Sequence, residues 1–175
     1  MKPKIKIVYS KYYHDHITKE MKKIAEKSLQ DKGFSFDSIG VPGSFEIPYE
    51  IARSIKQETL DKENNIGIFK GKDKDKMRDN ILKLAKLSQL NLDQSCIYSG
   101  FLALGCIIKG KTVNHEAISV SIFTNLQKIS IENNIPIGNG IFNANNLKEA
   151  ENKYFRCTEQ ALNVLFTFMN DKKKK

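Results

Sequence analysis

The chain has 175 residues, a length that favours one domain with a substantial hydrophobic core. Apolar residues make up 40% of it and charged residues 28%, as in an ordinary soluble protein, and no apolar run approaches the ~20 residues that a membrane-spanning helix needs. The formal net charge of +9 could attract nucleic acid or anionic metabolites. The lysines are spread along the chain without interleaved aromatic residues, however, so we expect neither a nucleic-acid partner nor a membrane partner.

The three cysteines, Cys96, Cys106 and Cys157, are widely spaced and odd in number. Such a set fits a reducing cytoplasm better than a disulfide framework or a zinc site. The first residues are basic, but they form too short and too polar a stretch for a secretory signal. We therefore expect a cytoplasmic protein without a metal site.

Strands and helices are predicted to alternate in the first 55 residues. A strand at 4–10 precedes a helix with apolar residues at helical spacing, which ends at Gly33. A second strand at 34–41 leads through a Pro-Gly turn to a helix that has Pro48 near its start. This order of elements favours a parallel sheet with helices on both faces.

A polar interval at about 56–94 interrupts this alternation. It is highly charged and almost without aromatic residues, and only the part at 77–90 has an amphipathic pattern. We predict an insertion that contains a flexible loop and one helix. A partner-binding segment is the alternative interpretation, because a basic tract beside a helix can bind another molecule.

The most informative stretch runs from a strand at 96–108 into a helix at 115–133. The strand is apolar at nearly every position, which is typical of a strand buried on both faces. It ends in the basic loop 109–112, and ligands bind at the carboxyl ends of strands in open α/β sheets. His115 and Glu116 lie at the helix start, so the pattern suggests an anion site with an acid/base group beside it. On the loop alone an ordinary solvated turn is the favoured alternative, because the spacing of a P-loop is absent.

The rest of the chain predicts one more strand and two more helices. The strand at 135–142 contains two glycines, which allow close approach of another backbone. Helical segments follow at 145–153 and 155–169, and the basic tail at 171–175 is expected to be disordered.

Four segments, in this order along the chain, resemble one known family. They are SKYY at 10–13, VPGSFEIP at 41–48, ALGCIIKGKT at 103–112 and PIGNGI at 136–141. The family is that of lumazine synthase. The resemblance covers most of the chain apart from the insertion and the tail. It implies a single domain over 1–175 with a flavodoxin-like three-layer α/β sandwich, in which helices lie on both faces of a central parallel sheet.

The resemblance also implies an activity and an assembly. The family condenses 5-amino-6-ribitylaminouracil with 3,4-dihydroxy-2-butanone 4-phosphate to give 6,7-dimethyl-8-ribityllumazine in riboflavin biosynthesis. An amine forms an imine with a ketone, phosphate leaves and a second ring closes, and no cofactor is required. The implied partners are the two small-molecule substrates, further copies of the chain in a pentamer or a multiple of it, and riboflavin synthase. The active site in this family lies between neighbouring subunits.

Eleven residues match substrate-binding positions of the family. Tyr12 matches the aromatic residue that stacks on the pyrimidine ring, and the other matches bind the ribitylamino chain, line the pyrimidine pocket or hold phosphate. Ser44, Phe45 and Glu46 match residues that bind the ribitylamino chain of the substrate, and Cys106, Ile107 and Ile108 match residues that line the pyrimidine pocket. Lys111, Thr112 and Lys153 match residues that hold phosphate. The last match is Asn139, where many members carry an aromatic residue. The alternatives are a core tyrosine for Tyr12 and helix capping for Ser44 and Glu46.

Two departures from the family pattern affect these assignments. The catalytic histidine usually stands two residues after the threonine, where this chain has Asn114, and His115 follows it. An amide cannot shuttle a proton but an imidazole can, so His115 is the predicted catalytic residue. The phosphate-binding arginine aligns with Lys153, a cation without the bidentate fork, and a shifted alignment offers Arg156 instead. A pentameric scaffold or ligand-binding protein with weakened chemistry is therefore the alternative function, and Asn114 is its main support.

Overall fold

The computed structural model describes residues 3–65 and 97–171. The chain divides into two compact units, one of residues up to Ala52 and from Tyr98 onward, the other of Arg53–Ile97. The first unit contains all the described strands and most of the described helices. The prediction of one domain with an insertion at about 56–94 stays a prediction, since most of that interval lies outside the described residues.

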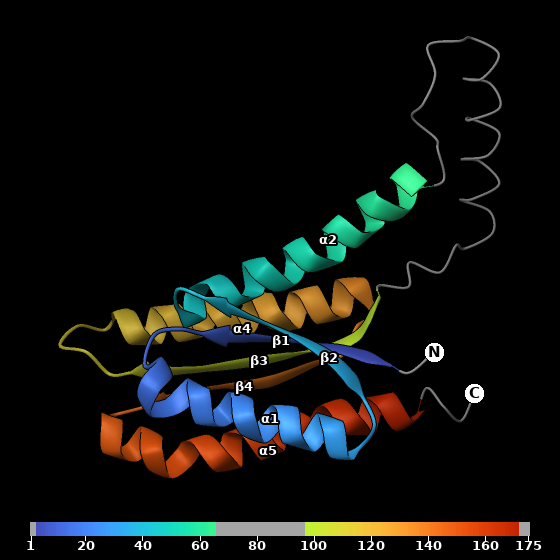
Figure 1. Ribbon diagram of the computed structural model, residues 1–175. Helices are drawn as coiled ribbons and strands as arrows, with labels where there is room; N and C mark the ends of the chain where they lie inside the picture. The colour runs from blue at the N-terminus through green and yellow to red at the C-terminus, as the bar shows by residue number, and fades with distance from the viewer. Residues whose placement is uncertain (1–2, 66–96, 172–175) are drawn as a thin grey trace, which may run out of the picture. The chain divides into compact units, whose positions relative to one another are not determined.

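Four strands form one parallel sheet in the order β2-β1-β3-β4 (Figure 1). They are β1 (Lys4–Ser10), β2 (Ser35–Val41), β3 (Tyr98–Ile108) and β4 (Ile137–Ala144). In the register, Ile7 lies opposite Ser38 of β2 and Leu102 of β3, and Leu104 of β3 lies opposite Gly140 of β4. Because all four strands are parallel, the loops that follow them emerge at one edge of the sheet.

Helices cover both faces of the sheet, which makes three layers (Figure 1). Helices α1 (Lys19–Asp31) and α5 (Leu147–Asp171) lie on one face, while α4 (Asn114–Asn133) and the first turns of α2 (Ile47–Asn65) lie on the other. The predicted flavodoxin-like α/β class is therefore confirmed. None of the described helices is both long enough and apolar enough to cross a bilayer.

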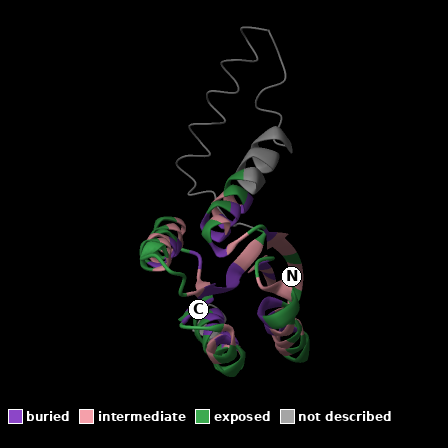
Figure 2. Cartoon of the chain, turned by 90° about the vertical axis from the view of Figure 1, so that its left-hand side faces the viewer, coloured by how far each residue is buried: buried purple, intermediate pink, exposed green. Residues whose placement is uncertain are grey.

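The hydrophobic core follows directly from the sequence pattern. Every residue of β3 from Gly100 to Ile107 is buried, as predicted for a strand covered on both sides. Buried residues lie in the sheet and along the inward faces of the helices, and exposed residues lie on the outer faces (Figure 2). Residues four apart on α1, namely Met21, Ala25 and Leu29, are all fully buried. Each large apolar side chain buried in this way stabilises the fold by about 1.5–3 kcal/mol.

The end of α1 confirms the stop signal predicted at Gly33. This glycine has φ +75°, its N–H bonds to Gln30 O at 2.9 Å, and the N–H of Phe34 bonds to Leu29 O at 2.9 Å. These two bonds form a Schellman motif, which satisfies carbonyls at the end of the helix. Glycine is favoured at this position because its backbone is left-handed, where most side chains would be strained.

Two predictions about helices were wrong, and one helical turn was not predicted. The segments predicted at 145–153 and 155–169 are one helix, α5, because buried residues such as Ala150, Thr158 and Leu162 stay in helical register and no glycine or proline breaks it. Helix α2 continues to Asn65, into the predicted loop, since this stretch is rich in helix-forming Lys, Gln and Glu. A π-helical turn at His14–Thr18, which was not predicted, precedes α1. The helix predicted at 77–90 and residues 172–175 of the predicted tail lie outside the described residues.

Candidate functional site

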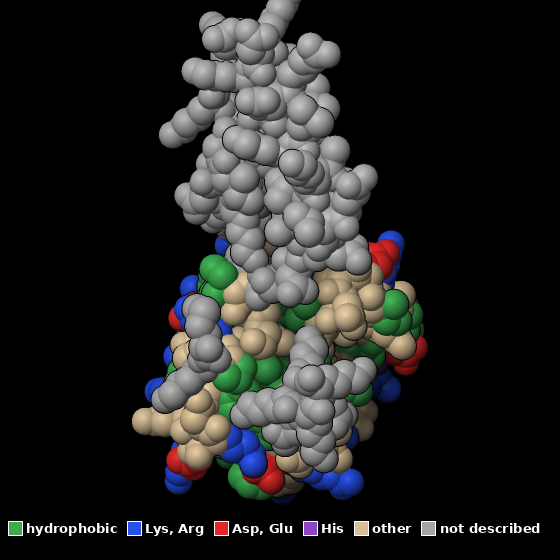
Figure 3. Space-filling model, turned by 90° about the vertical axis from the view of Figure 1, so that its right-hand side faces the viewer, with side chains coloured by type: hydrophobic (Ala, Val, Ile, Leu, Met, Phe, Trp, Pro, Cys, Tyr) green, Lys and Arg blue, Asp and Glu red, His purple; other side chains and the backbone are tan. Residues whose placement is uncertain are grey.

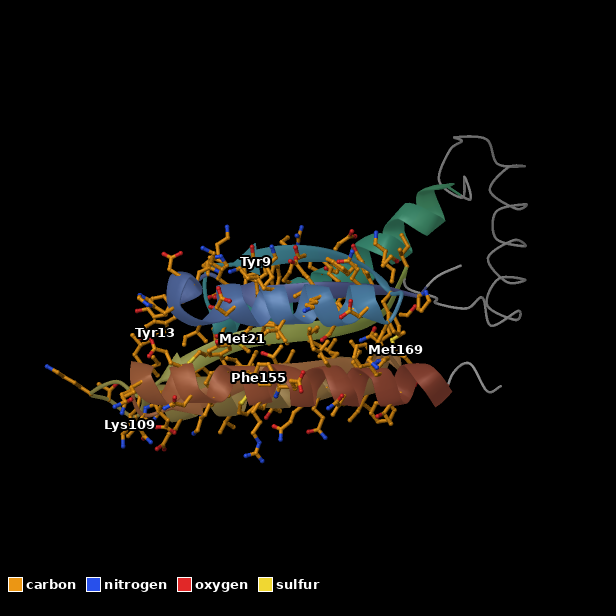
Figure 4. The ribbon with its side chains drawn as sticks, turned by 60° about the horizontal axis from the view of Figure 1, so that its bottom comes forward. Tyr9, Tyr13, Met21, Lys109, Phe155 and Met169 are labelled. Atoms are coloured by element: carbon orange, nitrogen blue, oxygen red, sulfur yellow. The ribbon has the colours of Figure 1, made fainter. Side chains whose placement is uncertain are left out.

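The predicted site residues are mostly at the carboxyl edge of the sheet. Tyr12 follows β1, the short 3₁₀ turn Ser44–Glu46 follows β2, the basic loop follows β3, and α5 begins just after β4. The N–H of Lys109 bonds to Ala144 O at 2.8 Å and so ties the end of β3 to the end of β4. In Figure 4, Tyr13 and Lys109 lie at the same end of the molecule, opposite Met169 near the end of α5.

His115 is held in a defined orientation in the first turn of α4. Its Nδ1 atom lies 3.0 Å from the carbonyl oxygen of Thr112, which can only accept a hydrogen bond. In the neutral ring Nδ1 therefore carries the hydrogen, and Nε2 keeps a lone pair that can accept a proton. Nε2 lies 3.8 Å from Glu116 Oε1, and the His115 side chain is only 13% exposed. The ring is thus a proton acceptor whose charged form has a carboxylate beside it.

Asn114, in the position where the family usually has histidine, is the first residue of α4 and is exposed. Lys111 and Thr112 in the preceding loop are exposed as well. An anion could therefore reach this loop and the start of the helix, where free N–H groups and the helix dipole favour negative charge.

Two residues that the sequence did not single out brace the turn that carries His115. The Ser119 hydroxyl lies 2.6 Å from the carbonyl oxygen of His115 and 2.8 Å from Oδ1 of Asn143 on β4. Ser119 is only 3% exposed whereas Asn143 is exposed, so this contact between helix and strand is partly buried. The one sequence signal is a serine four residues after the histidine, which is too common a spacing to have been informative.

In the turn Ser44–Glu46, the side chains of Ser44 and Glu46 form hydrogen bonds to backbone atoms of the same chain. Glu46 Oε2 accepts a hydrogen bond of 2.9 Å from the N–H of Gly43, the bond expected of a residue that caps a helix. The Ser44 hydroxyl is buried and donates to Cys106 O at 3.5 Å. Phe45, in contrast, is 56% exposed. The substrate roles of the three stay predictions, and Phe45 has the most accessible side chain of the turn.

The end of β3 places its three predicted pocket residues on two faces. Cys106 and Ile108 belong to the core on the side of α1 and α5, and the alternation of the strand puts Ile107 on the other side. Burial raises the pKa of Cys106 to about 12, the nearby Cys157 thiol adds to the rise, and the charge of Lys153 opposes it. Cys106 is therefore a neutral, apolar wall residue at pH 7 and not a nucleophile.

The two candidate phosphate-binding cations lie one turn apart on α5. Lys153 forms an ion pair with Glu149, and Glu149 also accepts bonds from the Asn145 N–H at 2.9 Å and the Asn145 side-chain amide at 2.8 Å. The hydrogen bond from Lys153, which has the largest effect, and those from Asn145 lower the pKa of Glu149 to about 2. Arg156 lies about 4.5 Å farther along the helix axis, away from the carboxyl edge. Lys153 is thus the nearer cation, but it shares its charge with Glu149.

Tyr12 and Asn139 lie in different parts of the molecule. The Tyr12 ring is 62% exposed, which rules out the alternative of a core tyrosine. Asn139 is exposed on β4, where its Oδ1 accepts a bond of 3.0 Å from the N–H of Ile141. It precedes the end of β4 at Ala144 by five residues, about 16 Å along the strand. Within one chain, Asn139 is therefore not brought together with the other predicted residues.

Charges are mixed on the one face of the molecule that Figure 3 shows. Around the rim of the face in Figure 3, lysine and arginine side chains lie among aspartate and glutamate side chains. This face gives no support to a nucleic-acid interface, which would need clustered positive charge. Residues 3–65 and 97–171 also contain no group of three or more His, Cys, Asp or Glu side chains that could hold a metal ion.

The fold and the site together define an α/β protein of flavodoxin-like type, with an acid/base group beside a basic loop at the carboxyl edge of its sheet. The family model described as 6,7-dimethyl-8-ribityllumazine synthase matches residues 2–76 and 79–165. The chain therefore belongs to the 6,7-dimethyl-8-ribityllumazine synthase family.

Individual relatives carry the same family name. The chain is 29% identical over 148 residues to the 6,7-dimethyl-8-ribityllumazine synthase of Bartonella bacilliformis, covering 85% of this chain and 73% of that protein. It is 28% identical over 149 residues to that of Agrobacterium fabrum, covering 85% and 78%. A 53-residue segment, 30% of this chain and 33% of the relative, is 49% identical to that of Buchnera aphidicola subsp. Baizongia pistaciae.

Proposed function

We propose that this chain is an active 6,7-dimethyl-8-ribityllumazine synthase, a transferase of riboflavin biosynthesis. It would condense 5-amino-6-ribitylaminouracil with 3,4-dihydroxy-2-butanone 4-phosphate in the cytoplasm and supply its product to riboflavin synthase. The observation that carries the proposal is the orientation of His115, whose Nδ1 bonds to Thr112 O at 3.0 Å beside an exposed basic loop. A proton acceptor and an anion-binding loop at one edge of the sheet are what this reaction needs.

The proposed chemistry assigns one task to each group. The amine of the pyrimidine attacks the ketone, and loss of water gives an imine. Departure of phosphate then needs a proton to be removed from the carbon beside the imine, and Nε2 of His115 would accept it. Lys111, Thr112 and the start of α4 would stabilise the leaving phosphate. Ring closure with loss of a second water completes the product, and no cofactor takes part.

Assembly into a pentamer, or a multiple of it, belongs to the same proposal. Asn139 lies about 16 Å from the carboxyl edge of its own sheet, so it would reach a substrate only at the edge of a neighbouring copy. An active site shared between neighbouring subunits accounts for a predicted substrate contact that one chain cannot complete.

The turnover assay tests this proposal. The purified full-length protein is incubated with both substrates, and formation of the lumazine is followed by its absorbance, with each substrate alone as the control. Product that depends on enzyme and on both substrates is expected. An assembled protein that forms no product would instead favour the catalytically weakened scaffold, for which the exposed Asn114 in the usual histidine position is the supporting observation.

Lys153→Ala is expected to raise the KM for the butanone phosphate about tenfold or more, while Arg156→Ala changes it little. A charge-assisted hydrogen bond is worth about 1.5–3 kcal/mol, and 1.4 kcal/mol is tenfold in affinity. Lys153 is preferred because it lies nearer the carboxyl edge. Steady-state kinetics at a saturating concentration of the pyrimidine measure the change.

Glu149 provides the control for this comparison, because removing Lys153 also leaves the Glu149 carboxylate without its ion-pair partner. The double variant Lys153→Ala/Glu149→Gln separates lost attraction from new repulsion. If neither Lys153→Ala nor Arg156→Ala weakens binding, the assignment of a phosphate-binding cation to this part of α5 is wrong.

A further inference from the structure

The backbone at Tyr13 adopts an unusual conformation. Tyr13 has φ 58° and ψ 29°, in the left-handed region, which is uncommon for a bulky side chain. Among the described residues, the others with positive φ are Gly33 and Asn134, residue types that tolerate it. Such strain persists only where the surroundings hold it, and it concentrates at functional sites.

The segment around Tyr13 is built to hold this conformation. Tyr13 starts the π-helical turn His14–Thr18, and its carbonyl accepts bonds from Ile17 N at 2.9 Å and from Thr18 N at 3.4 Å. The buried Thr18 hydroxyl donates to Ser10 O at 2.7 Å, and the Tyr12 N–H bonds to Ser10 Oγ at 3.1 Å. Both ends of the loop after β1 are thus fixed. Single π turns are rare and often mark functional sites.

The left-handed backbone places the Tyr13 ring between the core and Tyr12. Tyr13 is half-buried and packs against the core cluster on the side of α1 and α5. Its ring meets the Tyr12 ring edge to face, with centroids 4.6 Å apart and planes at 80°. The Tyr12 ring is 62% exposed, and an exposed ring without such a contact would sample several rotamers.

We propose that Tyr13 is a positioning residue, which holds the exposed Tyr12 ring in the orientation on which the planar pyrimidine substrate stacks. The inference rests on the proposed function, because it takes Tyr12 as the stacking residue. A ring fixed before binding loses less conformational freedom when the substrate arrives. Tyr13 itself does not touch the substrate, so its whole effect passes through Tyr12.

A double-mutant cycle tests this proposal. The variants are Tyr13→Asn, Tyr12→Ala and the double variant, since asparagine tolerates the left-handed backbone but has no ring. Calorimetry measures the Kd of 6-ribitylaminouracil, which lacks the reacting amine. We expect Tyr13→Asn to raise this Kd about two- to tenfold, the range for an aromatic pair, and to leave the KM of the butanone phosphate unchanged. In the Tyr12→Ala background the same change is expected to have no effect, and Tyr13→Phe, which keeps the ring, is expected to behave as the unaltered chain.

Three results would overturn the inference. An unchanged Kd in Tyr13→Asn, or an equal rise in the Tyr12→Ala background, would show that Tyr13 does not act through Tyr12 while the proposed function stands. An unaltered chain that does not bind the pyrimidine would instead remove the proposed function and this inference with it.

A second measurement keeps the native Tyr13, in case Tyr13→Asn does not fold. The chain contains no tryptophan, so Tyr12→Trp introduces a single tryptophan at this position, which can be excited apart from the tyrosines. Its time-resolved fluorescence anisotropy is expected to show restricted local motion in the folded protein. Free rotation of this side chain beside the native Tyr13 would overturn the proposal.

Discussion

His115→Ala is expected to lower turnover about 10²–10⁴-fold, the usual contribution of general acid/base assistance, while the protein stays folded and assembled. His115 is the group whose Nε2 is left as a proton acceptor by the bond from Nδ1 to Thr112 O. Single-turnover kinetics with both substrates measure the chemical step, and sedimentation measures the assembly. Full activity in an intact His115→Ala oligomer would refute the assignment, and loss of assembly in parallel with activity would make His115 an interface residue.

The other two histidines provide matched controls. His14 stacks on Tyr9, with centroids 5.3 Å apart, and its Nδ1 lies 3.1 Å from the Thr18 hydroxyl, so it is part of the loop after β1. His16 is exposed. We expect His16→Ala to retain full turnover and His14→Ala to affect mainly the loop. A loss in either variant as large as that in His115→Ala would reassign the proton shuttle.

Asn114→His asks whether the position usual in the family still faces the substrate. Asn114 and His115 are adjacent on a helix, where successive side chains point about 100° apart. Both cannot face the same group. A higher rate in Asn114→His would therefore show that this chain has lost part of its shuttle, whereas an unchanged rate would support His115 in its place.

The fold was predictable where one physical period dominated the sequence. The continuous apolar run of β3 is typical of a strand covered on both faces, and parallel strands place the loops that follow them at one edge. The basic loop, His115 and Tyr12 were therefore placed correctly at that edge. The two wrong predictions lie where the local signal was weak. The polar end of α2 has helix-forming residues but no apolar face, so its helical structure was not predicted. Helix α5 was divided in two because its apolar content changes along its length, although no residue interrupts it.

The site was less predictable because its supporting contacts join distant parts of the chain. The hydrogen bond between Ser119 and Asn143 joins residues 24 positions apart, and the local sequence around either residue does not predict it. The segment Cys106–Ile108 was treated as one pocket lining, but strand alternation divides it between two faces. The strain at Tyr13 is likewise a property of the folded loop, since tyrosine has no preference for a left-handed backbone.

Gly138 is the position where a single added methyl group is expected to affect the fold most. It is buried in β4 where this strand meets α5, and a Cβ there would lie 2.5 Å from the carbonyl oxygen of Ala161 and 2.9 Å from Cδ1 of Leu102. The nearest obstacle is helix backbone, which cannot rotate aside as a side chain can. The predicted close approach of another backbone at a glycine of this strand is therefore confirmed.

Gly138→Ala is expected to destabilise the protein by about 1–3 kcal/mol, the usual penalty for overpacking a core, because α5 must move away from β4. The matched control is Gly110→Ala, since a Cβ at Gly110 has nothing within 4 Å. Alanine restricts the unfolded chain more than glycine does, so the control is expected to be neutral or slightly stabilising. Urea unfolding of both variants at one protein concentration measures the difference, with equal m-values as the condition for comparing midpoints. Equal midpoints for the two variants would mean that α5 can shift away from β4 without a cost in stability. In that case the close packing of α5 on β4 would not fix the position of the start of α5 beside the site.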